Sequence, residues 1–182
     1  MYLAVNGSRV EPLVATVLPA PRPLPPFSLV DQHGRPFTNS SLTGRQSVMF
    51  FGFTNCPDIC PATLQQLAIA RQRLASSGTA DPDIILVSVD PERDTPEVLA
   101  EYVGHFGAGV RGVTGSVADI SEFTASLGIF FAISGDSEKD YSVDHSTAVL
   151  VIDGDGQWQA VFSAPHSIDS FVHDLPLLAD PG

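Results

Sequence analysis

Apolar residues occur along this chain in two contrasting patterns. Residues 47–53 (SVMFFGF) and 84–89 (IILVSV) form short runs that are almost continuously apolar, which is typical of strands buried on both faces of a sheet. Between them, over residues 61–77, apolar side chains recur at helical spacing, and Gly78 follows. That pattern predicts a helix with a glycine just after its C-terminus.

Capping and turn residues mark the remaining elements. Thr95 followed by Pro96 predicts a helix to about residue 106, and Ser116 with Asp119 predicts another to about residue 127. The pattern also predicts a small hairpin over residues 27–37, strands over 147–152 and 157–162 joined by an Asp-Gly turn, and a last helix over 168–178. This order predicts an α/β domain with a thioredoxin-like fold, in which helices flank a central mixed sheet and a hairpin lies near the N-terminus.

The first 26 residues differ from the rest in composition. Residues 18–26 (LPAPRPLPP) are rich in proline, which excludes a helix and favours extended geometry. We expect residues 1–26 to form an extension or tether, with a packed arm as the alternative, and residues 27–182 to form one domain. No run of about 20 apolar residues is present, so the sequence predicts no membrane span.

The net charge narrows the classes of partner. The chain carries 21 acidic and 9 basic residues, a formal net charge of -12. Such a surface repels nucleic-acid phosphates and anionic lipid head groups, so we expect no nucleic-acid binding. Nothing in the pattern specifies an oligomer, and a monomer is the expected state.

Two cysteines, Cys56 and Cys60, carry the most distinctive chemistry. They lie at the start of a predicted helix, where free backbone N–H groups and the helix dipole should lower a cysteine pKa. Asp58 between them opposes a second negative charge, and a cation held by the sulfurs would relieve that conflict. Four residues of near-helical chain return both side chains to one face. The pair can therefore bind one ion or form a disulfide.

Two thiolates leave a metal site incomplete, and His145 is the best candidate for a third ligand. It lies just before a predicted strand, where thioredoxin-like redox enzymes carry a proline that faces the cysteine pair. Asp144 beside it is placed to orient the ring or its loop. Two cysteines and one histidine suit Cu(I) and tolerate Cu(II), whereas structural zinc prefers a fourth ligand, for which only Asp58 could be argued. With Asp144, Asp58 is the expected outer partner of the metal ligands. We predict one copper ion per chain, with zinc as a competing metal.

Three separated motifs resemble one family. Residues 56–61 (CPDICP), 90–96 (DPERDTP) and 143–146 (VDHS) look like those of the SCO/SenC family of cytochrome oxidase assembly proteins, and the similarity covers about residues 27–178. Asn55 departs from the bulkier residue often found before the first cysteine. The resemblance implies a thioredoxin-like fold and copper bound by two cysteines and one histidine.

The resemblance also implies partners and a location. Members of the family assist formation of the dinuclear copper centre of cytochrome c oxidase subunit II, so that subunit and another periplasmic copper chaperone are the implied partners. Members are usually membrane-tethered and face the bacterial periplasm or the mitochondrial intermembrane space. For this chain we expect the periplasmic side of the bacterial inner membrane. Residues 90–96 fit either a loop that docks a partner or a strand exit followed by a helix cap.

Two other functions are compatible with the same residues. A thiol–disulfide oxidoreductase would keep the oxidase copper-site cysteines reduced, with Cys56 as the attacking thiol and Cys60 as its redox partner. A thiol peroxidase would also suit the fold, but the sequence places no arginine to activate peroxide. We expect a metallochaperone rather than an enzyme, with oxidoreductase activity as the alternative.

Overall fold

A computed structural model of the protein describes residues 11–134 and 142–179, with the backbone alone at residues 133–134 and 142–145. The strands are β1 (Thr16–Pro23), β2 (Ser28–Asp31), β3 (Pro36–Thr38), β4 (Ser47–Gly52), β5 (Asp83–Ser88), β6 (Val110–Thr114), β7 (Phe131–Ser134), β8 (Ser142–His145), β9 (Val149–Ile152) and β10 (Gln157–Phe162). The helices are α1 (Ile59–Ser77), α2 (Pro96–Gly104), α3 (Val117–Ser126) and α4 (Ile168–Leu178), and a short 3-10 helix (Asn39–Leu42) follows β3. None of these helices is long and apolar enough to cross a membrane.

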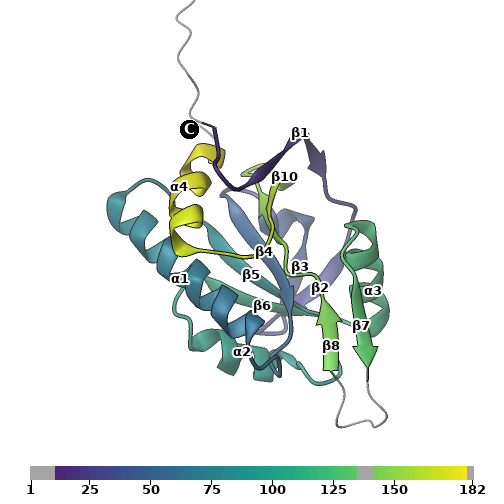
Figure 1. The fold of residues 1–182 in the computed structure, drawn as a ribbon. Coiled ribbons are helices and arrows are strands. Elements are labelled where there is room, and N and C mark those ends of the chain that lie inside the picture. Colours follow the sequence, from purple (N-terminus) through teal and green to yellow (C-terminus); the bar gives the residue numbers. More distant parts are fainter. Residues whose placement is uncertain (1–10, 135–141, 180–182) are drawn as a thin grey trace, which may run out of the picture.

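One large mixed sheet forms the centre of the molecule. Its strand order is β1-β10-β9-β4-β5-β6-β2-β3, and β7 and β8 form a separate two-stranded sheet (Figure 1). β4, β5 and β6 run parallel, whereas β9 and β2 pair antiparallel with the two ends of this parallel group. The predicted mixed sheet flanked by helices is confirmed, as is the hairpin near the N-terminus, which β2 and β3 form.

Helices cover both faces of this sheet. Every residue of β4 and β5 is buried, which requires cover on each side. The crossovers through α1 and α2 both step in the same direction along the sheet, and right-handed crossovers then place both helices on one face. α4 packs against α1 on that face, while α3 lies on the other side, near β7 (Figure 1).

The N-terminal arm joins the sheet. β1 pairs antiparallel with β10 and forms one edge of the sheet, where prolines are tolerated because the outer N–H groups need no partner. Ahead of β1, the carboxylate of Asp174 in α4 accepts hydrogen bonds from the backbone N–H groups of Leu13, Val14 and Ala15, at 2.9, 2.9 and 2.8 Å. From residue 13 to residue 23 the chain is therefore a packed arm, the alternative to a tether. Residues 1–10 lie outside the described residues.

Some elements differ from the sequence prediction. The sequence pattern did not predict β6, because Arg111 and Gly112 interrupt its apolar run. Glycine is nevertheless needed at position 112 for packing, because a Cβ atom there would lie 2.9 Å from the Cβ atom of Leu99. The sequence pattern also did not predict the small β7–β8 sheet. α1 begins at Ile59, two residues earlier than predicted, so Cys60 lies in its first turn.

Candidate metal centre

The two cysteines follow the central strand of the sheet. β4 ends at Gly52, the turn after it carries Cys56, and α1 begins one residue before Cys60. Gly52 is required by space, because a Cβ atom there would lie only 2.8 Å from the sulfur of Cys60. The end of the buried strand therefore holds the Cys60 sulfur in place.

Cys56 and Cys60 are not joined by a disulfide, and their thiols lie against each other. A hydrogen bond joins their side chains, and Cys60 is 0% exposed whereas Cys56 is 8% exposed. Burial, followed by the contact with Cys56, raises the pKa of Cys60 above its ordinary value. The expectation of a lowered cysteine pKa is therefore wrong for Cys60, because removal from water outweighs the free N–H groups of the helix start. A bound cation would reverse this preference for the protonated form.

Asp58 lies on the solvent side of the cysteine turn. It occupies the N-cap position of α1, and its exposed side chain makes no capping hydrogen bond. A carboxylate at this place is favoured by the helix dipole, which is a sufficient structural reason for an acidic residue. The role of Asp58 as an outer partner of the metal stays a prediction.

The fully buried carboxylate of Asp94 is hydrogen-bonded to the turn that leads to Cys56. Its oxygens accept hydrogen bonds from the backbone N–H and the hydroxyl of Thr54, at 3.0 and 2.6 Å, and from the hydroxyl of Ser88, at 2.7 Å. Burial raises the pKa of Asp94, and the hydrogen bonds from Thr54 and Ser88 offset this only in part. Asp94 thereby ties the turn before Cys56 to the loop between β5 and α2.

The rest of the 90–96 motif also has structural contacts. Asp90 is buried and pairs with Arg93. The Thr95 hydroxyl accepts a hydrogen bond from the backbone N–H of Val98 at the start of α2. The strand exit and helix cap are thus confirmed. Asp90 and Asp94 are 1% and 0% exposed, whereas Glu92 is exposed, and a docking role for this loop stays a prediction.

The backbone of His145 lies near the end of the central strands from which the cysteine turn emerges. Phe50 in β4 pairs with Val149 in β9, and the two strands are antiparallel. β9 therefore enters the sheet at the end where β4 leaves it toward the cysteines. His145 ends β8 just upstream of Val149 and pairs with Phe131 of β7. The side chains of His145 and Asp144 lie outside the described residues, so their roles stay predictions.

The described donors fit a soft metal ion. Among the side chains that the structure describes, no three His, Cys, Asp or Glu groups come together as a metal cluster. The described part of the centre is the sulfur pair, which is in contact, reduced and buried. Adjacent sulfurs in a medium of low dielectric constant suit Cu(I). The structure thus brings Cys56 and Cys60 together, and ligation by His145 stays a prediction.

Sequence reasoning missed three residues around the sulfurs: Gly52, Asp94 and Tyr102. The signal for Gly52 was a glycine at the end of an apolar strand, and the signal for Asp94 was the second acidic residue of the 90–96 motif. Tyr102 in α2 gave no signal. Its hydroxyl is buried, and burial followed by the influence of Cys60, Cys56 and Asp94 raises its pKa.

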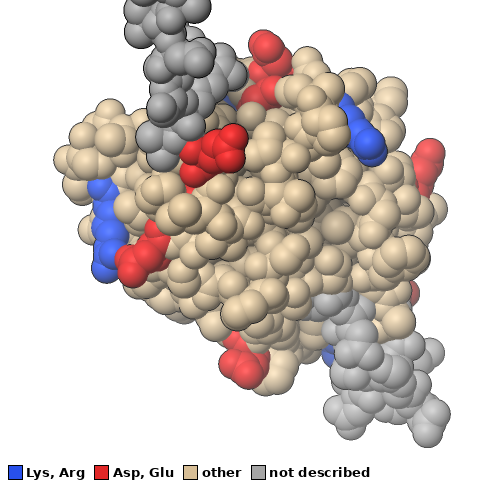
Figure 2. Space-filling model, turned by 45° about the horizontal axis from the view of Figure 1, so that its top comes forward, with Lys and Arg blue, Asp and Glu red and all other residues tan. Residues whose placement is uncertain are grey.

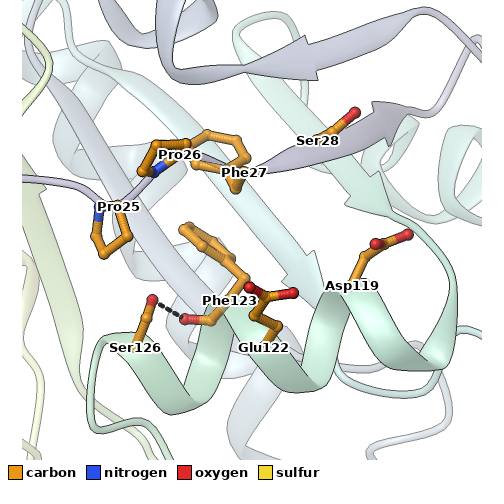
Figure 3. A pocket seen from close by; sticks show the side chains of 8 residues that line it. All are labelled: Pro25, Pro26, Phe27, Ser28, Asp119, Glu122, Phe123 and Ser126. Atoms are coloured by element: carbon orange, nitrogen blue, oxygen red, sulfur yellow. Dashed lines mark hydrogen bonds between the residues drawn. The ribbon is translucent and has the colours of Figure 1, made fainter.

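One hollow on the described surface is separate from the cysteines. A hollow of about 360 Å³ lies between α3 and the chain before β2 (Figure 3). Phe27 and Phe123 face each other in it with ring centroids 4.5 Å apart, and Asp119 and Glu122 line it. Neither cysteine borders this hollow. On the face drawn in Figure 2, acidic and basic side chains stand in isolated groups, which gives no basic track for a nucleic acid.

Comparison with known proteins identifies relatives over most of the chain. The family model described as SCO1/SenC matches residues 15–179. A Stutzerimonas stutzeri protein named "Putative copper-binding protein" is 36% identical over 164 residues, 90% of this chain and 80% of the relative. The mitochondrial SCO1 homolog 1 of Arabidopsis thaliana is 34% identical over 147 residues, 81% of this chain and 44% of the relative. The chain therefore spans less than half the length of that plant relative.

Solved structures extend the likeness to the fold. Arabidopsis thaliana ScoI with copper bound superposes with a TM-score of 0.79 at 33% identity, covering 84% of this chain and 94% of that one. BsSco, described as a member of the Sco family of cytochrome c oxidase assembly proteins with a disulfide switch, has a TM-score of 0.63 at 28% identity. The superposition covers 80% of this chain and 85% of the BsSco chain.

Proposed function

Because the chain belongs to the SCO1/SenC family, we propose that it is a copper metallochaperone for cytochrome c oxidase assembly. It binds one copper ion, Cu(I) or Cu(II), through Cys56, Cys60 and His145, and passes the ion to the dinuclear centre of oxidase subunit II. Copper in the related ScoI structure supports the choice of metal. On this chain the proposal depends on one observation, the buried pair of reduced sulfurs in contact at the end of β4.

The surroundings of the sulfurs suit reversible loading. Each thiol must lose its proton to bind copper, so loading one ion releases up to two protons. Since burial raises the pKa of Cys60, the empty site holds its proton and does not leave a free anion in the protein interior. Three ligands leave a coordination position for an incoming ligand of the acceptor, and Cys56 is the more exposed sulfur from which transfer would begin.

A copper titration of the fully reduced protein under anaerobic conditions tests this proposal. The variants are Cys56→Ser and His145→Ala, and His173→Ala is the matched control, because His173 lies on α4 and contacts Asp174. We expect about one tightly bound copper per chain in the wild type and the control, none in Cys56→Ser, and weaker binding in His145→Ala. Weak binding in the wild type, or binding indifferent to Cys56→Ser, would contradict the proposal.

A thiol–disulfide oxidoreductase is the second candidate, and the contact between the two thiols favours it. The Cys56 thiolate would attack a substrate disulfide and release one substrate thiol. Cys60 would then attack the mixed disulfide, release the second thiol and leave a Cys56–Cys60 disulfide, so that two electrons pass to the substrate. The disulfide switch described for BsSco is consistent with such a pair. Catalysed disulfide reduction that survives His145→Ala would favour this function.

The partners and location belong to the same proposal. We take oxidase subunit II as the acceptor and a second periplasmic copper chaperone as the donor, with this chain acting as a monomer on the periplasmic side of the bacterial inner membrane. The acidic composition supports a basic docking surface on a partner. Co-purification of copper-loaded chain with the soluble domain of subunit II, and copper transfer between them, would test the acceptor.

A further inference from the structure

A hydrogen bond joins the segment after β8 to a distant part of the chain. The carbonyl oxygen of Thr147, two residues after His145, lies 2.6 Å from Nε2 of His166. A carbonyl oxygen has no proton to give, so Nε2 carries the hydrogen and His166 is the donor. Both residues are half-buried. The side chain of His166 therefore holds the backbone that leads from His145 into β9.

Two other hydrogen bonds hold the same segment. The backbone N–H of Ser146 donates to the carbonyl oxygen of Phe130 at 3.0 Å, directly before β7, the strand that pairs with β8. The backbone N–H of Ala148 donates to the hydroxyl of Ser146 at 3.3 Å. The first bond joins the segment to the small sheet, and the second stays within the segment. The contact with His166 adds a tie to the C-terminal part of the chain.

His166 is itself held in place. Its ring stacks on that of Phe171 in α4, with 5.6 Å between the ring centroids and 29° between the ring planes. Phe171 is 0% exposed and packs edge-on against Phe162 of β10. The residue after His166 is Ser167, the N-cap of α4, whose hydroxyl accepts a hydrogen bond from the backbone N–H of Ser170. Packing of the ring and capping of the adjacent helix make His166 a rigid anchor.

A rigid anchor matters here because of where His145 lies. It ends β8, which belongs to the small two-stranded sheet and not to the large one that carries the cysteine turn. A ligand on such a segment binds tightly only if the segment is already held, since ordering it on binding costs free energy. Two thiolates suit Cu(I), whereas Cu(II) depends more on an imidazole. The placement of this backbone should therefore affect Cu(II) more than Cu(I).

We propose that His166 is a positioning residue of the copper centre: by holding the Thr147 carbonyl group, it fixes the backbone from which the side chain of His145 extends. The inference rests on the proposed function, in which His145 is a copper ligand. His166 does not contact the metal, so its effect on copper must pass through His145.

Copper affinity measured in a double-mutant cycle tests the inference. His166→Phe keeps a ring against Phe171 and removes the donor, and it is made both in the wild type and in His145→Ala. In the wild-type background we expect Cu(II) binding weaker by about 5-fold, the typical effect of one hydrogen bond, and a smaller change for Cu(I). In the His145→Ala background we expect no further change, because no ligand remains to be positioned.

The matched control is Gln159→Leu. The side-chain amide of Gln159 donates to the carbonyl oxygen of Leu178 at 2.7 Å, at the other end of α4, so this substitution also removes one bond from a side chain to a carbonyl group. In the metal-free protein, we expect amide hydrogen exchange at Ser146 to be about 5-fold faster in His166→Phe than in the control. The control should keep wild-type affinity for both copper ions.

The outcomes separate this inference from the proposed function. Equal losses of Cu(II) affinity in both backgrounds, unchanged affinity in His166→Phe, or Ser146 exchange that matches the control would each overturn the inference. The proposed function would stand in these cases, because it requires only that the wild type binds one copper and that His145→Ala weakens binding. If His145→Ala binds copper like the wild type, His145 is not a ligand and the inference fails with that part of the proposal.

Discussion

Asp174 and Asp94 are both 0% exposed, but their surroundings differ. Asp174 accepts three backbone hydrogen bonds from the N-terminal arm and lies 2.6 Å from a ring nitrogen of His173. Burial acts to raise its pKa, but these hydrogen bonds outweigh burial and lower it. Asp94, beside the cysteine turn, accepts from Thr54 and Ser88, and there burial prevails and raises the pKa.

This contrast separates a region built for stability from a region built for chemistry. The hydrogen bonds from Leu13, Val14 and Ala15 to Asp174, here called the clamp, stabilise its charge and fasten the N-terminal arm to α4. Around the cysteines, burial disfavours charge on Asp94 and Cys60 alike, and the buried hydroxyl of Tyr102 has no hydrogen-bond partner among the described residues. Local conflicts of this kind concentrate at functional sites, where a ligand resolves them. A copper ion is the ligand that would resolve this one.

The largest expected effect is on the clamp. Asp174→Ala removes the acceptor of three backbone N–H groups, so we expect the free energy of unfolding to fall by about 3 kcal/mol. Asp169→Ala, on the same helix, is the matched control, because Asp169 is 93% exposed and pairs only with exposed Arg73 among described residues. We expect a change of about 0.5 kcal/mol or less for the control. If urea denaturation showed equal losses in the free energy of unfolding for the two variants, the three backbone hydrogen bonds to Asp174 would not be a source of stability.

The next effect concerns the space beside the Cys60 sulfur. Gly52→Ala places a methyl group where only 2.8 Å is available, so we expect a loss of about 2 kcal/mol in stability together with weaker copper binding. Gly104→Ala is the control, since nothing lies within 4 Å of a Cβ atom there, and it should be neutral or slightly stabilising. Wild-type copper affinity in Gly52→Ala would contradict the close packing between strand and sulfur.

The substitution Asp94→Asn tests whether the charge of Asp94, unlike that of Asp174, contributes little to stability. The amide keeps the shape of the side chain and removes a buried charge that is incompletely compensated, so we expect a stability change within about 1 kcal/mol. Denaturation of this variant beside Asp174→Asn measures the contrast directly. If Asp94→Asn costs as much as Asp174→Asn, the two aspartates play the same part and the distinction fails.

The smallest effect is on the pH dependence of stability. Since the pKa of Asp174 is lowered in the folded protein, its contribution is present above the unfolded value of about 4 and is lost as pH falls through the folded value. Asp94, with a raised pKa, contributes with the opposite sign. Acid titration of stability should therefore be shallower in Asp174→Ala than in the wild type. An identical acid profile would remove Asp174 as a source of acid sensitivity.

Much of the fold could be predicted because local signals agree with the tertiary structure. The continuous apolar runs become the buried strands β4 and β5, and the caps at Thr95 and Ser116 begin α2 and α3 as expected. β1 could not be predicted in the same way, because its pairing with β10 and its clamp at Asp174 join residues about 150 positions apart. Proline-rich composition describes an extended chain without saying whether it packs.

The candidate site, like the fold, could be predicted from the sequence only in part. The two sulfurs lie together, as the four-residue spacing predicts, although Cys56 lies in the turn before α1 and the segment between the cysteines is not helical throughout. The direction of the Cys60 pKa shift could not be obtained locally, because it follows from burial by distant elements. The antiparallel register of β9 and β4 supports the choice of His145, whose side chain remains a prediction.

X-ray absorption spectroscopy of the copper-loaded protein tests the central claim most directly, because it counts the atoms bound to the metal. With one copper per chain, we predict two sulfur ligands and one imidazole nitrogen, and loss of the imidazole signal in His145→Ala. A copper bound without sulfur, or by four sulfurs shared between two chains, would contradict a centre made of Cys56, Cys60 and His145.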